Sequence, residues 1–211
     1  MNFTESKRMR ELIAFTNQLM VEGLANEGDS VSVRLSSTEI LITATPVKHR
    51  DITIENVSKV LISDDLSAHR FGDLHAKIYH ARSDINAIIT NHAPHCVGLS
   101  LTESKFPAVL DDVAQIIGPR VYVAPSSEIK SVLKCLKGHG ACIVKNECVV
   151  ATGRTVDEAH TAALVLEKGA RAYIEGSVLG GAKKIPYFEA KLMRFVYKTK
   201  YSKADQEAKL Q

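Results

Sequence analysis

Several features that mark specialised classes of protein are missing from these 211 residues. There is no tryptophan, and the four cysteines form no C-x-x-C pair, so nothing indicates a disulfide framework. No apolar run approaches the roughly 20 residues that a membrane-spanning helix needs. The first residues carry no apolar segment of the kind found in signal peptides. We therefore expect a cytoplasmic protein with reduced, buried cysteines and no membrane partner.

A strong charge of either sign is also absent. The sequence has 27 Lys and Arg against 24 Asp and Glu, and the formal net charge of +3 argues against a dedicated nucleic-acid binder. A basic tail with aromatic residues, 182–211, could still bind nucleic acid. We favour a helical tail that packs its aromatic side chains on its own domain or on a neighbouring subunit. Length and a hydrophobic content of 45% predict one domain over residues 1–211.

The hydrophobic pattern alternates between helical and strand periods. It predicts helices over residues 6–25, 71–82, 106–117, 126–136 and 155–175, and strands over 30–35, 39–44, 59–63, 84–90, 120–124, 141–145 and 147–151. The run over 84–90 is almost continuously apolar, which is typical of a central strand covered on both faces. A tight hairpin is expected around Asn146, and Thr155 and Glu158 form a capping box. The predicted fold is α/β, with a mixed or largely antiparallel sheet covered by helices.

The residues with the clearest chemical interest follow the central strand. In IITNHAPHCVGLS, residues 88–100, His92 and His95 stand three apart where the strand ends. Histidines in such a position suggest a zinc site. The position two before His92, on the same face of the strand, is Thr90.

Four segments, in order, resemble the class II aldolase/adducin family. They are SVSVRLSSTEILITATPV at 30–47, HAKIYHARSDINAIITNHAPH at 75–95, KGHGACIV at 137–144, and the capping box followed by AALVLEKGARAY at 162–173. The resemblance covers most of the chain. It implies an α/β fold with a central antiparallel sheet, commonly assembled as a homotetramer with sites between subunits.

The resemblance also implies a chemistry. Members such as fuculose-phosphate aldolase hold Zn²⁺ with three histidines, two from a His-x-His strand end and one from a His-Gly turn. An open coordination position lets the metal stabilise an enediolate. A glutamate on the preceding helix transfers the proton of the substrate during catalysis. Backbone and hydroxyl groups hold the substrate phosphate.

Only part of this ligand set matches. His92 takes the place of the second strand histidine, and His139, followed by Gly140, takes the place of the His-Gly histidine. The first strand histidine falls on Thr90, and the catalytic glutamate falls on Phe71. Threonine is a poor zinc ligand and phenylalanine transfers no proton, so standard cleavage of a sugar phosphate is not expected.

The phosphate-binding positions differ as well. The family asparagine falls on Ser30, or on Asp29 if the register shifts by one, and the Thr-Gly pair becomes Thr45 followed by proline. The two serines fall close to His69 and Arg70. Ser30, Thr45 and Arg70 are the candidate substrate-binding residues. Proline in place of glycine removes a backbone N–H, which alters this part of the phosphate site.

Two residues could compensate for the losses. If Pro94 opens a helix, His95 lies in its first turn and could join His92 and His139, which we expect to be neighbours, in a three-histidine centre. The alternative is a His95 that belongs to the helix start. Asp73 could replace the missing acid or base, but it stands half a helical turn from Phe71, and a carboxylate in a first turn also favours the helix dipole.

Two hypotheses follow. In the first, the chain keeps the family fold but has a degenerate metal and catalytic site, and it acts as a binding or assembly homologue. In the second, it is a metal-dependent lyase or isomerase of altered chemistry that acts on a small carbonyl or sugar-like substrate. That enzyme would use a divalent metal, with zinc as one option, held by His92, His139 and His95. Both hypotheses include a homo-oligomer, a tetramer by resemblance.

Overall fold

The computed structural model describes residues 3–26, 28–43, 52–67, 69 and 71–208. The helices are α1 (Phe3–Val21), η1 (Ile54–Asn56), α2 (Gly72–Ala81), α3 (Pro94–Leu99), η2 (Val113–Ile117), α4 (Ile129–Leu136), α5 (Val156–Val178) and α6 (Tyr187–Ala208). The strands are β1 (Ser30–Arg34), β2 (Glu39–Thr43), β3 (Val57–Leu61), β4 (Ala87–Asn91), β5 (Lys105–Pro107), β6 (Arg120–Ala124), β7 (Ala141–Val144) and β8 (Cys148–Gly153). None of the helices in this part of the chain combines the length and apolar character that crossing a membrane requires.

One sheet organises the molecule. Its eight strands run in the order β3-β2-β1-β4-β8-β7-β6-β5, and every neighbouring pair is antiparallel except β6 and β7. All five residues of β4 are buried, as the apolar run predicts for a central strand. The fold class predicted from the sequence, α/β with a mixed, largely antiparallel sheet, is confirmed.

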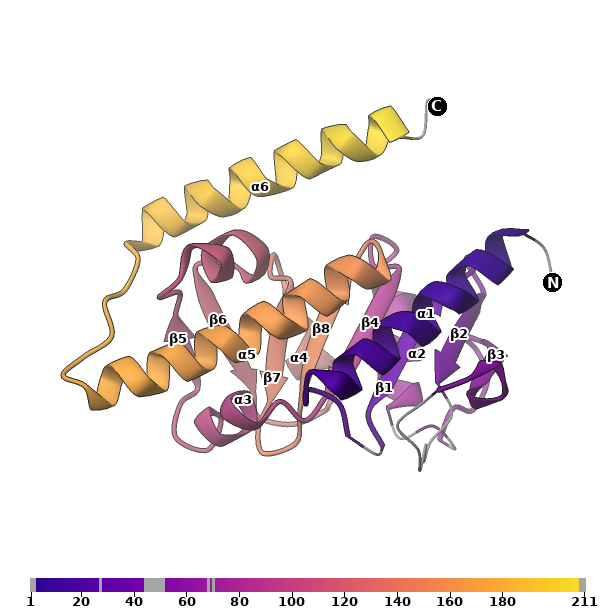
Figure 1. The fold of residues 1–211 in the computed structure, drawn as a ribbon, viewed down its shortest axis with the longest axis horizontal. Coiled ribbons are helices and arrows are strands. Elements are labelled where there is room, and N and C mark those ends of the chain that lie inside the picture. Colours follow the sequence, from indigo (N-terminus) through magenta and orange to yellow (C-terminus); the bar gives the residue numbers. More distant parts are fainter. Residues whose placement is uncertain (1–2, 27, 44–51, 68, 70, 209–211) are drawn as a thin grey trace.

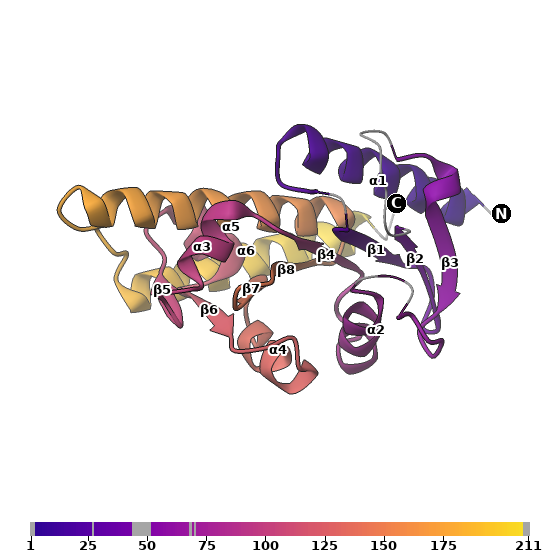
Figure 2. The same cartoon turned by 90° about the horizontal axis from the view of Figure 1, so that it is seen from below.

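Helices cover both faces of this sheet. Figure 2 shows α1 and α5 on one side and α2 and α4 on the other. Each side has its own hydrophobic cluster: Leu12, Ile89 and Leu166 belong to the first, and Phe71, Ile88 and Val150 to the second. Neighbouring residues of β4 therefore enter different cores, as the two-residue period of a strand requires.

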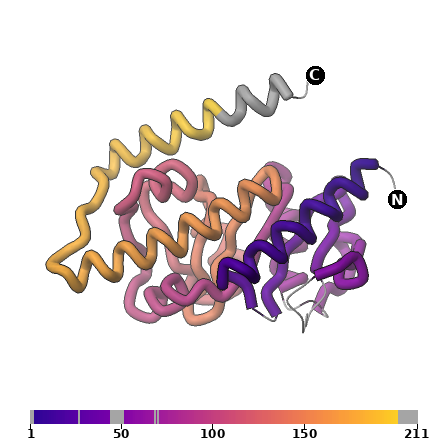
Figure 3. The backbone as a smooth tube through the Cα atoms, viewed as in Figure 1, coloured from indigo at the N-terminus to yellow at the C-terminus, as the bar shows by residue number. Residues whose placement is uncertain are grey.

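The last helix lies at the rim of the molecule. The tube in Figure 3 reverses direction after α5, and α6 then runs back along the body, as Figure 1 also shows. The contacts of α6 with the body are mainly to η2. Arg194 makes part of this contact, because its Nη1 donates to the carbonyl oxygens of Gln115, at 2.8 Å, and Ile116.

One predicted helix is wrong. Residues 106–117 divide into the short strand β5 and the π-helical turn η2, which begins only at Val113. Pro107 explains the division, since proline disfavours helical backbone angles in the preceding residue, Phe106. Phe106 instead pairs with Val121 of β6 and is buried.

Candidate functional site

The end of β4 and the start of β1 meet at one edge of the sheet. Thr90 pairs with Ser30, so the residue after β4, His92, lies beside the residue before β1, Asp29. The β7–β8 turn reaches the same edge, because Asn91 pairs with Val149. We call Asp29, Phe71, Thr90 and His92 the His92 edge.

An imidazole–carboxylate pair forms its polar part. His92 Nδ1 contacts Asp29 Oδ1, and the backbone N–H of His92 donates to Oδ2 of the same carboxylate at 3.2 Å. The backbone N–H of Asn26 donates to Oδ2 at 2.7 Å. Burial raises the pKa of Asp29, and its bonds to Asn26 and His92 oppose that shift. With an ionised Asp29, the imidazole carries its proton on Nδ1 and is held in one orientation.

Thr90 belongs to a buried network that leads away from His92. The hydroxyl of Thr90 donates to the carbonyl of Ser30 at 3.3 Å and lies 3.2 Å from Nε2 of His75. The other ring nitrogen of His75 lies 2.8 Å from the hydroxyl of Ser32, which contacts Tyr79 in turn. Burial lowers the pKa of His75 to about 3, so this imidazole is neutral at physiological pH. Thr90 is thus engaged in a neutral polar chain.

The position that the resemblance assigns to a glutamate is apolar. Phe71 immediately precedes α2, is buried in the cluster beneath that helix, and places its ring centroid 6.1 Å from that of His92. Asp73 does not replace the carboxylate there. Its Oδ1 accepts the backbone N–H of Leu66 at 3.2 Å, and it lines a surface hollow with Lys77, further along α2.

His95 is directed to the other face of the sheet. Pro94 does open α3, as the sequence predicts. His95 then places Nδ1 2.6 Å from Oε1 of Glu167 on α5, and the backbone N–H groups of His95 and Cys96 donate to the same carboxylate at 3.0 Å. Glu167 therefore anchors the start of α3 on α5, whereas His92 contacts Phe71 on the face that α2 covers.

His139 lies at the opposite edge, and the prediction that it neighbours His92 is wrong. β8 is antiparallel to both β4 and β7, so β7 runs in the same direction as β4. His139 precedes β7 and lines a pocket with Gly153, whose partner Ala87 opens β4. His92 follows the end of β4, five residues away, which at strand geometry is about 16 Å. The two histidines of one chain cannot share a metal ion.

Some of the predicted residues are not brought together, and some are not described. Among the described residues, no group of three or more His, Cys, Asp or Glu side chains could hold a metal ion. Ser30 is buried at the His92 edge, and its hydroxyl has no partner among those residues. Thr45 and Arg70 lie outside the described residues, so their predicted contact with a substrate stays a prediction.

Two features of this edge were missed by reasoning from sequence alone. Asp29 enters the prediction only as a register alternative, not as the partner of His92. Glu147, in the turn before β8, lies at the His92 edge by strand register, where we expected His139. The position of Glu147 could have been predicted from the hairpin around Asn146. The turn of a hairpin and the far ends of its two strands lie at opposite edges of a sheet, so Glu147 in the turn and His139 before the first strand cannot lie at the same edge.

A family model and curated relatives identify the family of this chain. The model of the class II aldolase and adducin N-terminal domain matches residues 10–174. The 5-deoxy-D-ribulose 1-phosphate aldolase of Bacillus thuringiensis is 23% identical over 194 residues, covering 85% of this chain and 90% of the relative. The L-fuculose phosphate aldolase of Escherichia coli is 27% identical over 184 residues, covering 80% and 83%.

Solved structures share the fold. An L-fuculose 1-phosphate aldolase superimposes with a TM-score of 0.82 at 21% identity, over 92% of this chain and 97% of the other. YgbL of Klebsiella pneumoniae, described as a putative aldolase/epimerase/decarboxylase, gives a TM-score of 0.74 at 22% identity, over 92% and 100%.

Proposed function

The chain belongs to the class II aldolase and adducin family, and from this premise we propose that it acts by binding or assembly rather than by zinc-dependent cleavage of a sugar phosphate. One observation carries the proposal. At the His92 edge, Thr90 is bonded to His75 and Phe71 is packed in the core. These are the positions that the family resemblance assigns to a zinc ligand and to the proton-transferring glutamate.

The chemistry of the donor set supports this proposal. A catalytic zinc site needs about three protein ligands and an open position. At this edge His92 and Asp29 already bind one another, and Thr90 is an uncharged hydroxyl in a hydrogen-bonded chain. These residues do not fit a three-histidine zinc site. Phe71 offers neither a proton acceptor nor a proton donor, so enolisation of a substrate would lack its base.

The His92 edge retains groups suited to holding a small polar ligand. The His92–Asp29 pair combines a partly exposed imidazole with a nearly buried carboxylate, and the ring centroid of Phe71 lies 6.1 Å from that of His92. Such a mixture of one oriented polar pair and an apolar surface is common in sites for small molecules. We propose a small carbonyl or sugar-like compound as the ligand.

A second candidate function is a metal-dependent lyase or isomerase that acts on such a carbonyl compound. Two observations favour it: the relatives are named as aldolases, and His92 remains at the strand end. In this case His92 would need further ligands from another subunit, because the described residues bring no group of three or more potential metal ligands together, and His95 and His139 lie elsewhere. That requirement joins the second function to the predicted homo-oligomer.

Metal content and substrate turnover distinguish the two functions. After purification without chelator, we expect less than about 0.1 equivalent of transition metal per chain, far below the one ion that a catalytic site holds. We also expect no consumption of L-fuculose 1-phosphate or 5-deoxy-D-ribulose 1-phosphate when zinc is added. Near-stoichiometric zinc that is lost in His92→Ala but kept in the surface control His80→Ala would contradict the proposal and support the second function.

A further inference from the structure

The largest concentration of positive charge around a described pocket lies far from the His92 edge. A pocket of about 240 Å³ opens where β4 begins and β8 ends, between the loop after α2, the start of α5 and the inner side of α6. Four permanent cations line it, Arg82, Arg154, Arg194 and Lys198, together with His139. We call this the cationic pocket.

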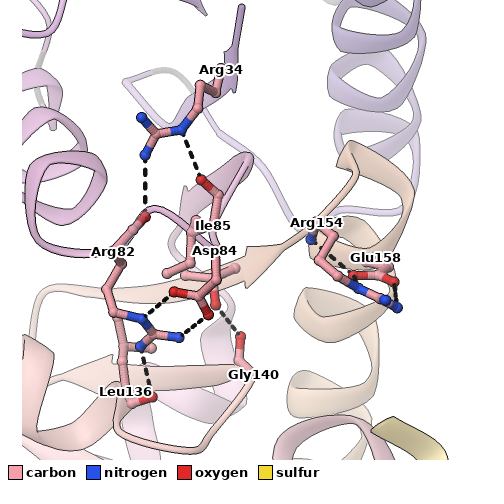
Figure 4. Close-up of polar contacts among 9 residues, drawn as sticks. Arg34, Arg82, Asp84, Ile85, Leu136, Gly140, Arg154 and Glu158 are labelled. Atoms are coloured by element: carbon pink, nitrogen blue, oxygen red, sulfur yellow. Dashed lines mark hydrogen bonds and ion pairs between the residues drawn. The ribbon is translucent and has the colours of Figure 1, made fainter. Parts of the chain in front are cut away.

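Two carboxylates among the lining residues neutralise only part of this charge. Arg82 binds Asp84 with two hydrogen bonds of 2.7 and 2.6 Å, and Arg154 binds Glu158 from its Nε at 3.2 Å and from Nη2. Figure 4 shows these two pairs, one from the loop after α2 and one from the start of α5. With four cations and two carboxylates lining it, the pocket has an excess of two positive charges.

Arg194 is held in place before any ligand arrives. Its Nη1 donates to the carbonyl oxygens of Gln115 and Ile116, which fixes the guanidinium at the wall of the pocket. Its Nε is buried and has no hydrogen-bond partner among the described residues. A buried polar atom without a partner is rare in folded proteins and costs stability, and an anion bound beside this guanidinium offsets part of that cost through its charge.

The cations of the pocket also interact unfavourably with one another. Burial lowers the pKa of Lys198, and the nearby Arg194 and Arg82 lower it further. Burial likewise lowers the pKa of Arg194, to about 10. Like charges brought together in a partly desolvated place disfavour their own charged forms, and an anion between them removes that cost.

We propose that the cationic pocket binds the phosphate group of a small phosphomonoester. Guanidinium groups match phosphate oxygens with paired hydrogen bonds, and a phosphomonoester carries nearly two negative charges at pH 7, equal to the excess of the pocket. The pocket volume admits a phosphate with a few attached carbons but no large ligand. None of the residues of the His92 edge lines this pocket, so the proposal is independent of the function proposed above.

Isothermal titration calorimetry with inorganic phosphate, glycerol 3-phosphate and succinate tests this proposal on the full-length protein. We expect both phosphates to bind at millimolar concentration or below, and succinate at least tenfold more weakly. Lys198→Gln should weaken phosphate binding about tenfold, the effect of one charge-assisted hydrogen bond. Lys198 is the residue to change because Arg194 also holds α6 against η2.

Two controls complete the design. Lys191→Gln removes the same charge from an exposed position of α6 outside the pocket and should leave binding unchanged. His92→Ala should also leave it unchanged. The proposal is overturned if neither phosphate binds up to about 10 mM, if succinate binds as well as phosphate, or if Lys191→Gln weakens binding as much as Lys198→Gln. It is equally overturned if only His92→Ala abolishes binding.

Discussion

At the scale of single residues, Thr90 stands where the family resemblance implies a zinc ligand, and its contacts extend beyond the strand end. A hydroxyl at this position completes a chain that runs from the carbonyl of Ser30 through His75 to Ser32. All of these side chains are fully buried. Since a buried polar group without a partner costs about 1–3 kcal/mol, each member of the chain depends on its neighbours. Thr90 is therefore part of the packing of α2 against β1 and β4.

The buried imidazole predicts a pH dependence of stability. The pKa of His75 is lowered from 6.5 in the unfolded chain to about 3 in the fold, so between these values only the unfolded state binds the proton. The contribution of His75 is complete above pH 6.5 and decreases as the pH falls towards 3. Between pH 7.5 and 5.0, the wild type should lose about 2 kcal/mol more unfolding free energy than His75→Gln.

Urea unfolding at the two pH values measures this difference, and the other titrating groups cancel between the two proteins. Equal losses would contradict the prediction. If His75→Gln does not fold, the ring proton shifts of His75 in the wild type provide the same information by NMR, because they should not titrate above pH 4 or so.

At the scale of elements, the short helix α3 is bonded at its first turn to a carboxylate of a neighbouring helix. α3 has only six residues and gains little stability from its own hydrogen bonds. Glu167 of α5 accepts the first N–H groups of α3 and contacts the ring of His95. One carboxylate on a neighbouring helix thus holds the first turn of α3, while Cys96 and Leu99 pack the helix on the body.

Removal of this anchor should destabilise the whole domain. Glu167→Ala leaves the buried N–H of Cys96 without a partner, and we expect a loss of about 2–4 kcal/mol in unfolding free energy. Glu175→Ala is the matched control on the same helix. It removes an exposed ion pair with Arg171 and should change stability by no more than about 0.5 kcal/mol. Similar losses in both variants, measured by urea unfolding, would refute the anchoring role of Glu167.

At the scale of the whole molecule, α6 leaves an apolar surface uncovered. Phe188, Leu192, Phe195 and Val196 are all exposed on this helix, whose contacts with its own chain are mainly to η2. A continuous apolar surface on a well-formed helix marks an interface with another protein. This surface agrees with the homo-oligomer predicted from the sequence and provides a place to test it.

Charged substitutions on α6 should separate the subunits. We expect the wild type to sediment as an oligomer, and Leu192→Glu with Phe195→Glu to sediment with at most half of that mass, because two carboxylates would have to be buried in the interface. Lys191→Glu, an exposed position on the same helix, should leave the mass unchanged. A wild type that sediments as a monomer would rule out the predicted assembly.

Local patterns in the sequence were sufficient for much of the fold. The apolar run before His92 predicted the buried central strand β4, and Asn146, with φ of 54°, stands in the predicted hairpin turn. Thr155 caps α5 as expected by accepting the N–H of Glu158 at 3.2 Å. Each of these features depends on residues close together in the chain, where spacing and turn chemistry act directly.

Tertiary structure alone decided which groups meet. Whether His139 lies beside His92 depends on the directions of β4, β8 and β7. The spacing of residues within one segment does not predict how strands from distant segments pair. The same pairing brings Asp29 to His92, and the packing of α6 on η2 brings Arg194 and Lys198 to the cationic pocket. The sequence by itself determined the family and the α/β class, and it placed a threonine where the resemblance implies a histidine. The positions of the charged groups that remain follow from long-range packing, because no short segment contains both partners of those contacts.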